Sequence, residues 1–258
     1  MTAYDPFAEL KGKAILITGA STGIGAACAR AFAALGAKVA IHYNSSAAAA
    51  EALAKEIGAA GGTAVLVTAD VSKSADAKRM VEEAAEKLGG LDGLINNAGG
   101  MVGRKPYAEI DDAYYDAVMD LNARQVVVAS RAALPYLKRQ GGFIINTTSI
   151  AARNGAAGGA GLYGSSKAFV SNITRGMAKE FIPFGIRVNA VAPGVITTPF
   201  HERYSTAEQL AAMKATVPQG RLGVAEDCVG AYLFLAAASL SGYVIGQVIE
   251  VNGGQLMP

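Results

Sequence analysis

A tyrosine and a lysine four residues apart are the side chains in this sequence best suited to proton transfer. Tyr163 and Lys167 stand in the stretch YGSSK, and residues at i and i+4 of a helix share one face. A free phenol has a pKa near 10, so ionising it at neutral pH requires about 4 kcal/mol of differential stabilisation. A nearby ammonium group in a partly desolvated cleft, helped by a second positive charge, would supply stabilisation of that order. Tyr163 is therefore a candidate general acid/base, although a surface tyrosine and lysine would show the same spacing.

Glycines gather in the segment AILITGASTGIGAACARAFAALG, which predicts a strand, a glycine turn and a helix. Gly19, Gly23 and Gly25 stand at the turn and at the helix start. A strand that runs directly into a helix presents unpaired N–H groups and the positive end of the helix dipole to an anion. The turn therefore predicts a site for a dinucleotide pyrophosphate or, taken alone, only a tight connection.

Several further motifs, in a fixed order, make the chain resemble the short-chain dehydrogenase/reductase family in its single-domain form. They are TGASTGIG at 18–25, Asp70-Val71, NNAG at 96–99, Asn122 in DLN, TTS ending at Ser149, YGSSK at 163–167 and VNAVAPGVITT at 188–198. The resemblance covers nearly the whole chain. It implies an NAD(P)-dependent oxidoreductase that moves a hydride between the nicotinamide C4 and a carbonyl or secondary alcohol carbon of a small metabolite.

The resemblance also implies a catalytic tetrad of Asn122, Ser149, Tyr163 and Lys167. Tyr163 would be the general acid/base, and Ser149 would hydrogen-bond the substrate carbonyl oxygen. Lys167 would lower the Tyr163 pKa, helped by the charge of an oxidised nicotinamide, and would hold the nicotinamide ribose. Asn122 would position a water molecule that passes protons to Lys167.

The family's cofactor contacts carry over to several segments of this sequence. The implied residues lie in the glycine turn, at the end of the second strand, after the third and fourth strands, and around the sixth: Gly19, Ser21, Thr22, Gly23, Ile24, Gly25, Tyr43, Asn44, Ser45, Asp70, Val71, Asn97, Ala98, Gly99, Tyr163, Lys167, Pro193, Gly194, Ile196 and Thr198. Asp70 and Val71 would contact adenine. The Ile196 backbone would bond the carboxamide, and Thr198 would bond the carboxamide or the pyrophosphate.

The end of the second predicted strand, IHYNSS, bears on the choice between NADP(H) and NAD(H). NAD-selective relatives usually carry an acidic residue where Tyr43 stands, bonding the ribose hydroxyls. With no carboxylate to repel a 2′-phosphate, the sequence favours NADP(H), with Asn44, Ser45 and His42 as donors. No arginine or lysine occupies this stretch, so NAD(H) also remains a candidate.

The substrate end of the cleft is expected to be mostly apolar, with a few charges at its edges. Its expected apolar walls are Met101, Val102, Ile150, Val195, Phe200, Tyr204 and Met213. Arg104, Lys105 and Arg153 could meet an anionic group or could simply be solvated. We interpret His201 as a surface residue of a lid rather than as a base.

Two alternative functions stay open at this stage. The pattern also resembles 3-oxoacyl-(acyl-carrier-protein) reductases, but Gln140 and Phe184 stand where those enzymes often carry arginine, with Arg139 adjacent. A non-catalytic cofactor sensor or scaffold is the other, and the complete tetrad argues against it. The family is commonly tetrameric, through the helices predicted at 111–137 and 162–184, so we expect a homotetramer.

Alternating strands and helices must position these residues. Apolar runs predict strands at 14–18, 38–42, 64–68, 93–96, 143–146, 186–192 and 248–251. Helical periodicity predicts helices at 24–35, 47–60, 74–88, 111–137, 162–184 and 225–238. Strands that are apolar throughout fit a parallel sheet covered on both faces. We therefore expect an α/β fold with one doubly wound, Rossmann-like domain over residues 1–258, a seven-stranded parallel sheet, and an irregular substrate lid at about 194–223.

Composition excludes several other classes of protein. The 258 residues are 52% hydrophobic and 17% charged, the reverse of a disordered chain. A formal net charge of +2 without a basic block argues against a nucleic-acid binder. Two distant cysteines, Cys28 and Cys228, have no metal-site or redox spacing and are expected in the core, and no metal site is predicted. No segment reads as a signal peptide or a membrane span, which predicts a cytoplasmic protein without membrane contact.

Overall fold

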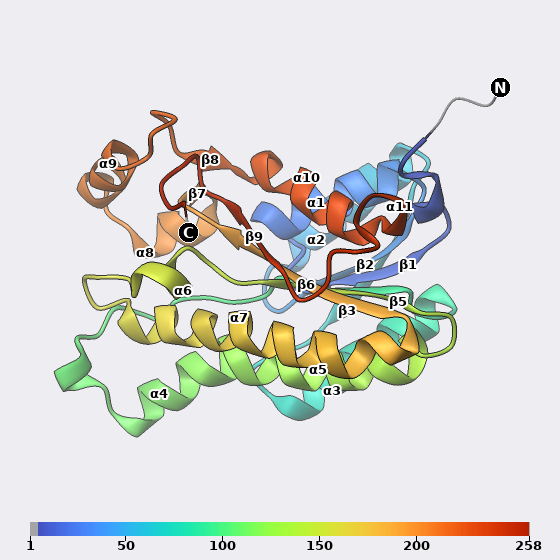
Figure 1. Ribbon diagram of the computed structural model, residues 1–258, viewed down its shortest axis with the longest axis horizontal. Helices are drawn as coiled ribbons and strands as arrows, with labels where there is room; N and C mark the ends of the chain where they lie inside the picture. The colour runs from blue at the N-terminus through green and yellow to red at the C-terminus, as the bar shows by residue number, and fades with distance from the viewer. Residues whose placement is uncertain (1–4, 258) are drawn as a thin grey trace.

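A seven-stranded parallel sheet forms the centre of the molecule (Figure 1), in the strand order β3-β2-β1-β4-β5-β6-β9. The computed structural model describes residues 5–257. The strands are β1 (Ala14–Ile17), β2 (Lys38–Tyr43), β3 (Thr63–Thr68), β4 (Gly93–Asn96), β5 (Gly142–Thr147), β6 (Ile186–Pro193) and β9 (Val248–Val251). All seven match the strands predicted from sequence to within one residue at either end. The order reverses between β1 and β4, and such a switch point creates a crevice at the carboxyl ends of the strands.

Helices cover both faces of the sheet, as the apolar strands predict (Figure 1). One face carries α1 (Gly23–Ala34), α2 (Ala47–Ala59), α10 (Ala225–Ala236) and the short α11 (Ala238–Ser241). The other carries α3 (Ser74–Leu88), α5 (Gln125–Leu137) and α7 (Gly161–Phe181), which a 3₁₀ turn, η4 (Ile182–Phe184), extends. A first 3₁₀ turn, η1 (Ala8–Leu10), precedes β1.

Each central strand supplies residues to both cores, because successive side chains point to opposite faces of a sheet. In β1, Ile15 and Ile17 pack with α1 and α10, whereas Leu16 packs with α3 and α5. Cys28 and Cys228 are both buried in the first of these cores. The prediction that they are packing residues is therefore confirmed.

The helix predicted at 111–137 is interrupted. It consists of α4 (Asp112–Met119), a π-helical turn η3 (Asp120–Arg124) and α5. The N-cap Asp111 accepts a hydrogen bond from the Tyr114 backbone N–H at 2.8 Å, which begins the helix where the sequence placed it. The π turn contains Asn122, and such turns occur frequently at functional sites.

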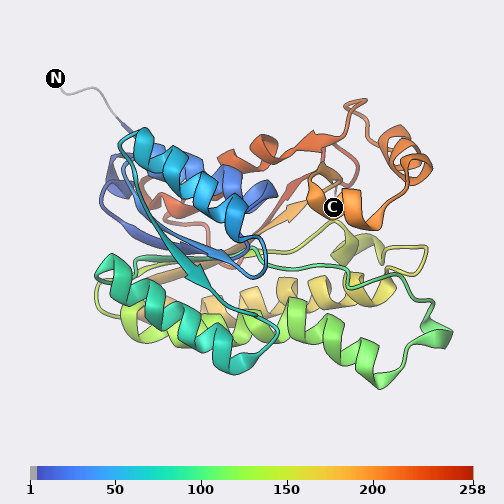
Figure 2. The same ribbon diagram turned by 180° about the vertical axis from the view of Figure 1, so that it is seen from behind.

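The segment predicted as irregular after β6 is largely ordered, and that prediction was wrong. It holds β7 (Ile196–Thr197), α8 (Pro199–Tyr204), α9 (Ala207–Ala215) and β8 (Gly223–Val224). Thr198 precedes Pro199 at the first turn of α8, and the pair Thr206 and Gln209 forms a capping box at α9. A short helix, α6 (Ala151–Asn154), follows Ser149, and the 3₁₀ turn η2 (Tyr107–Glu109) lies after β4. Seen from behind, α8 and α9 lie at the same end of the molecule as the C-terminus (Figure 2).

Candidate active site

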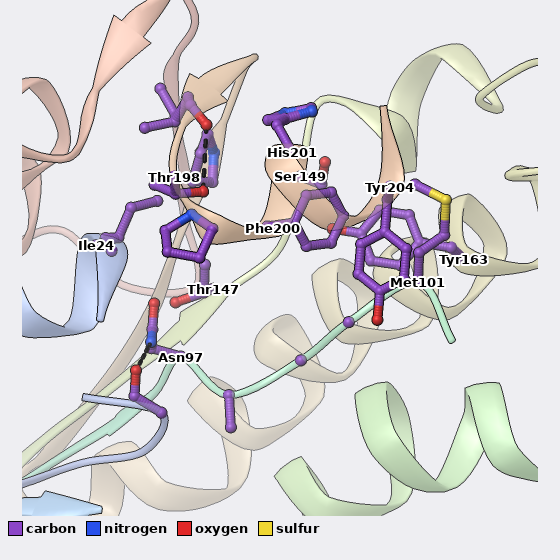
Figure 3. A pocket seen from close by; sticks show the side chains of 18 of the residues that line it. Ile24, Asn97, Met101, Thr147, Ser149, Tyr163, Thr198, Phe200, His201 and Tyr204 are labelled. Carbon is purple, nitrogen blue, oxygen red and sulfur yellow. Dashed lines mark hydrogen bonds between the residues drawn. The ribbon is translucent and has the colours of Figure 1, made fainter. Parts of the chain in front are cut away.

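One cleft of about 560 Å³ lies at the carboxyl ends of the strands and is lined by nearly all of the predicted site residues. Among the predicted catalytic and cofactor-binding residues, Gly25 and Asn122 are the two that do not line it. Ile24 and Asn97 mark one side of the cleft, while Tyr163, Tyr204 and Met101 mark the other, with Ser149 and Phe200 between them (Figure 3). The structure thus brings together residues from the glycine turn, four strand ends, α7 and the lid.

In the glycine turn, backbone atoms of neighbouring segments lie so close together that there is no room for a side chain. A Cβ atom at Gly25 would lie 2.5 Å from the Gly19 carbonyl oxygen and 2.9 Å from the Ala20 Cα. Gly19 and Gly23 have φ angles of +63° and +57°, in the left-handed region that favours glycine. Gly25 is therefore a packing requirement of the turn rather than a wall of the cleft.

His42 supports this turn and is not the phosphate donor that the sequence suggested. Its Nδ1 accepts a hydrogen bond from the Gly19 N–H at 2.9 Å, so its Nε2 carries the proton and donates to the Ala69 carbonyl at 3.1 Å. Burial lowers the pKa of His42, which keeps the ring neutral. Both ring nitrogens are used, and no sequence signal links the end of β2 to Gly19.

A second set of bonds joins the turn to the NNAG segment. The Thr18 hydroxyl accepts hydrogen bonds from the backbone N–H groups of Asn97 and Ala98, both at 2.9 Å. The Asn97 amide nitrogen donates to the Thr18 and Gly19 carbonyls at 2.9 and 3.1 Å. Two loops 80 residues apart in sequence are thereby held as one rigid surface. Thr18 begins the TGASTGIG motif, but no role was predicted for its side chain.

The Tyr163 phenol lies in a desolvated part of the cleft. Burial raises the pKa of Tyr163 to about 12, and the Ser149 hydroxyl partly offsets that rise. Lys167 Nζ lies 5.9 Å from the centroid of the Tyr163 ring. The expected role of Lys167 in lowering the pKa of this phenol also involves the charge of an oxidised nicotinamide, so that role stays a prediction.

Lys167 is itself buried, and the structure describes one hydrogen bond from its ammonium group. Its Nζ donates to the Thr147 carbonyl oxygen at 2.9 Å, at the end of β5. Its own backbone carbonyl accepts a bond from the Thr148 hydroxyl at 2.8 Å. Burial lowers the pKa of Lys167 to about 8. A lysine perturbed in this way, in a cleft, marks a functional site more often than a structural one.

Asn122 supports the site from beneath the cleft. Its amide nitrogen donates to the carbonyls of Gly100 and Val118, at 2.8 and 2.9 Å, and its oxygen accepts from the Gly100 N–H at 3.1 Å. A Cβ at Gly99 would meet the Asn122 Oδ1 at 2.8 Å and the Lys167 Nζ at 3.1 Å. Gly99, Asn122 and Lys167, which come from separate elements, therefore lie close together. The side chain of Asn122 uses its hydrogen bonds to fix the loop after β4.

Aromatic side chains of the lid pack against Tyr163 at the substrate end. The Phe200 ring centroid lies 5.7 Å from that of Tyr163, 5.1 Å from Tyr204 and 5.2 Å from His201. Of the predicted apolar walls, all but Val102 line the cleft. Val102 has a positive φ of 64° and is exposed, which corrects that prediction.

The charged residues at this end separate into two groups. Lys105 pairs with Asp111 at 2.7 Å and Arg153 pairs with Glu250 at 3.3 Å, and neither lines the cleft. Arg104 does line it, and so does Arg203, which the sequence analysis did not single out. His201 is half-buried in the cleft rather than on the surface, and its Nδ1 lies 2.9 Å from the Ser205 hydroxyl.

The C-terminal tail completes the wall of the cleft. Gln255 lines it and donates from Nε2 to the Thr216 hydroxyl, just beyond α9, at 2.7 Å. The backbone N–H of Gln219 bonds to the Gly253 carbonyl at 3.1 Å. Nothing in the sequence around Gln255 indicates this role, because the contact depends on how the tail folds back beyond β9.

Comparison with known proteins agrees with this geometry. A family model described as Enoyl-(Acyl carrier protein) reductase matches residues 19–255. A 3-oxoacyl-[acyl-carrier-protein] reductase of Synechocystis sp. is 38% identical over 252 residues, covering 96% of this chain and 98% of that protein. The chain belongs to the short-chain dehydrogenase/reductase family. Within that family, the solved NADH-dependent reductase A1-R′, described as responsible for alginate metabolism, is 40% identical with a TM-score of 0.89, covering 97% of this chain and 100% of its own.

This short-chain dehydrogenase/reductase is therefore an oxidoreductase that acts on CH–OH or carbonyl groups. A relative from Burkholderia cenocepacia, solved in complex with NADP, is 35% identical with a TM-score of 0.89, covering 95% of this chain and 98% of its own. Reductase A1-R′ has been solved with NAD. A nicotinamide cofactor fits this chain as well, because the glycine turn, the N-terminus of α1 and the residues that follow β2, β3 and β4 line one cleft.

Two further findings concern metals and membranes. Within residues 5–257, no three His, Cys, Asp or Glu side chains gather as a metal site would require. None of the helices that the structure describes combines the length and apolar character needed to cross a bilayer.

Proposed function

We propose that this protein interconverts a carbonyl and a secondary alcohol on a small metabolite, with Tyr163 as general acid/base and NADP(H) as the favoured cofactor. The observation that carries the proposal is the convergence of Ser149, Tyr163 and Lys167 on one desolvated corner of the cleft. Perturbed titratable groups in a cleft that also holds a phosphate-binding turn are what a hydride-transfer site requires.

In this proposal each side chain acts on a stated atom. The Ser149 hydroxyl hydrogen-bonds the substrate oxygen and holds it beside Tyr163. In the direction of reduction, the carbonyl carbon receives a hydride, the Tyr163 hydroxyl gives its proton to the oxygen, and the phenolate takes a proton back from solvent. A bound nicotinamide supplies the hydride and, once oxidised, a positive charge near the phenol. Lys167 adds its own charge and its hydrogen-bond donors at the same corner.

The residues that would hold the cofactor extend along the cleft from the lid to the end of β2. Thr22, Gly23 and Ile24 offer the N-terminus of α1 to the pyrophosphate, and Thr198 and Ile196 reach the nicotinamide side. Tyr43, Asn44 and Ser45 line the ribose end without a carboxylate, which supports NADP(H) over NAD(H). Asp70, held by the Ser72 hydroxyl at 2.6 Å, lines the adenine side.

The wider assembly is part of the same proposal. Residues 1–258 would form one unit with a lid at about 194–223, working in the cytoplasm as a homotetramer. Exposed apolar residues on α4, α5 and α7, including Tyr115, Val127 and Phe169, support subunit contacts through these helices. Light scattering after gel filtration tests the tetramer, and a monomer at micromolar concentration would contradict it.

The test of the chemistry uses Tyr163→Phe with an acetoacetyl thioester, small ketones and cyclic ketones as probes. We expect wild type to oxidise NADPH with at least one of them and the variant to lose about 10²–10⁴-fold in kcat, since that is the usual contribution of a general acid. The Kd for NADPH should stay within a few-fold. Equal turnover by the variant would refute the assigned role of Tyr163.

The acetoacetyl thioester also tests the acyl-carrier alternative. Gln140 donates to Asp92 at 2.7 Å, and Phe184 lies under the Lys138 ammonium at 3.6 Å, so neither place offers an arginine-like grip on an acidic carrier. We expect poor turnover of the thioester compared with small ketones. Fast turnover that Tyr163→Phe abolishes would instead place the acyl reductase first.

A further inference from the structure

The substrate end of the cleft has an unbalanced positive charge. Arg104 and Arg203 line it, along with the buried Lys167, and the sole carboxylate among the described cleft residues is Asp70 on the adenine side. Asp70 is already held there by Ser72 and Lys73. A cleft with charges of one sign and low-dielectric walls attracts ligands of the opposite sign.

Arg104 is positioned for recognition rather than for an internal ion pair. Its Nε donates to the Tyr204 carbonyl at 3.0 Å and one terminal nitrogen donates to the Gly158 carbonyl at 3.1 Å. The ion pairs that the structure describes include its neighbours Lys105 and Arg153 but not Arg104. Neutral carbonyls fix the guanidinium plane while leaving its charge uncompensated and its other terminal nitrogen available to a ligand.

Arg104 lies in the loop after β4, and its hydrogen bonds join this loop to two other segments of the substrate pocket. Tyr204 ends α8 of the lid, and Gly158 belongs to the loop after α6. Two non-glycine residues hold left-handed backbone here, Val102 at φ 64° and Ala156 at φ 48°. Such conformations persist where surrounding structure imposes them, and they gather at ligand-binding sites.

The neighbouring His201 adds no countercharge. Burial and the Arg104 charge together lower its pKa, which leaves it neutral at pH 7. His201 can therefore offer a hydrogen bond beside Arg104 without competing for the guanidinium.

We propose that Arg104 binds an anionic group on the substrate, so that the natural substrate is a small carbonyl compound or alcohol bearing a carboxylate or a phosphate. The inference rests on the proposed function and narrows its substrate class. An arginine fork matches either oxyanion bidentately, which neutral ketones cannot exploit.

The experiment compares matched pairs of probes with NADPH. The carboxylate pairs are pyruvate, acetoacetate and levulinate against their methyl esters, and the phosphate pair is dihydroxyacetone phosphate against dihydroxyacetone. We expect kcat/KM for at least one anion to exceed that of its neutral partner by roughly tenfold or more, the usual scale for a charge-assisted hydrogen bond. Which pair shows the largest ratio distinguishes a carboxylate from a phosphate.

The variant Arg104→Gln should bring that ratio to about one by raising KM for the anion, and Arg104→Lys should restore part of it. Lys105→Gln is the matched control, because it removes the adjacent positive charge from a residue outside the cleft, and its ratio should equal that of wild type. The ratio is the readout, since Arg104 also ties the lid and absolute rates respond to both roles.

Three outcomes would overturn the inference: neutral partners preferred or equal in wild type, a ratio unchanged in Arg104→Gln, or a Kd for NADPH raised about tenfold by that variant, which would assign Arg104 to the cofactor. The proposed function fails separately if no probe is turned over, or if Tyr163→Phe retains turnover. Quenching of bound NADPH fluorescence by the anions, in wild type and in Arg104→Gln, then still decides whether Arg104 binds an anion.

Discussion

The two sides of the cleft are held in place by different means. On the cofactor side, Thr18, His42 and Asn97 tie the glycine turn to three strand ends, and all of these contacts lie at or within the sheet. On the substrate side, α8 and α9 contain no buried residue. They are attached through Arg104, the contact between Phe200 and Tyr163, and the bond from Gln255 to Thr216.

The difference separates what is common to the family from what distinguishes its members. Hydride transfer requires fixed geometry, which strand ends supply because their positions are set by the whole sheet. Substrate choice tolerates adjustment, and surface elements with few buried contacts can change without disturbing the core. Substitutions on the two sides should therefore have different effects on stability, cofactor affinity and KM.

The largest effect is expected on the cofactor side, at Gly25. Gly25→Ala places a Cβ against the Gly19 carbonyl and Asn97 amide, at 2.5 and 2.6 Å, so the turn must open. We expect a loss of about 2–3 kcal/mol in the free energy of unfolding and at least about tenfold in NADPH affinity. Chemical denaturation and fluorescence titration measure both.

Gly58→Ala in α2 is the matched control, because a Cβ there meets nothing within 4 Å. Alanine at an open helical position should stabilise the protein by about 0.5–1 kcal/mol and leave NADPH affinity unchanged. Equal behaviour of the two variants would mean that the turn is looser than its geometry indicates.

Substitution of Lys167, which lies between the two sides of the cleft, should affect stability and activity in opposite directions. Because burial depresses its pKa from 10.5 to about 8, the folded state favours the neutral amine. The resulting destabilisation is fully present below pH 8 and fades as pH rises toward 10.5. Lys167→Met should therefore be more stable at pH 7, by about 1–2 kcal/mol after losing the bond to Thr147, and inactive.

Denaturation of wild type and Lys167→Met from pH 7 to 10.5 measures this effect. Wild-type stability should rise relative to the variant across that window. A variant less stable than wild type at pH 7 would show that the bond to Thr147 outweighs the cost of burying the charge.

A smaller change is expected at Tyr43, where the ribose end of the cleft lacks a carboxylate. Tyr43→Asp should repel a 2′-phosphate and accept bonds from ribose hydroxyls, shifting the ratio of kcat/KM for NADPH to NADH by roughly tenfold toward NADH. Tyr43→Asn is the control of similar size without the charge. An unchanged ratio would place the phosphate elsewhere.

The smallest effect is expected in the lid. Thr206→Ala removes the capping box that begins α9, a loss of about 1 kcal/mol in local helix stability. Because α9 buries no residue, we expect the global unfolding free energy to change by less than about 0.5 kcal/mol and KM for the substrate to rise, with the Kd for NADPH unchanged. A raised Kd would show that the lid also holds the cofactor.

The same division describes what could be predicted from sequence. The strands are apolar on both faces, so their positions and the parallel sheet can be predicted from the apolar runs in the sequence. The order of the motifs also predicts that Ser149, Tyr163 and Lys167 share one cleft, as they do in the structure. His42 could not be assigned, because its partner Gly19 lies 23 residues away and meets it only once β1 and β2 pair.

Other features were present in the sequence but outweighed by stronger patterns. Thr206 and Gln209 have capping-box spacing, yet the surrounding stretch was predicted as an irregular lid because it follows the carboxyl end of a strand, where such sheets bind ligands. The π turn at Asn122 leaves the helical periodicity of 111–137 almost intact, so periodicity alone predicted one continuous helix. The opposing effects of burial and the Ser149 hydroxyl on the pKa of Tyr163 depend on tertiary packing, which no spacing in the sequence reveals.

The fold of the tail has a practical consequence for anyone who purifies this enzyme. Gln255 lies in the wall of the cleft, whereas the segment from Pro6 to Leu10 lies at the far end of the molecule, beside α11 (Figure 1). A polyhistidine tag fused behind residue 258 would be separated by three residues from Gln255, whose side chain lines the cleft and bonds to Thr216. Kinetic constants should therefore be measured on protein tagged at the N-terminus, and a difference between the two tagged forms would report on how firmly the tail closes the pocket.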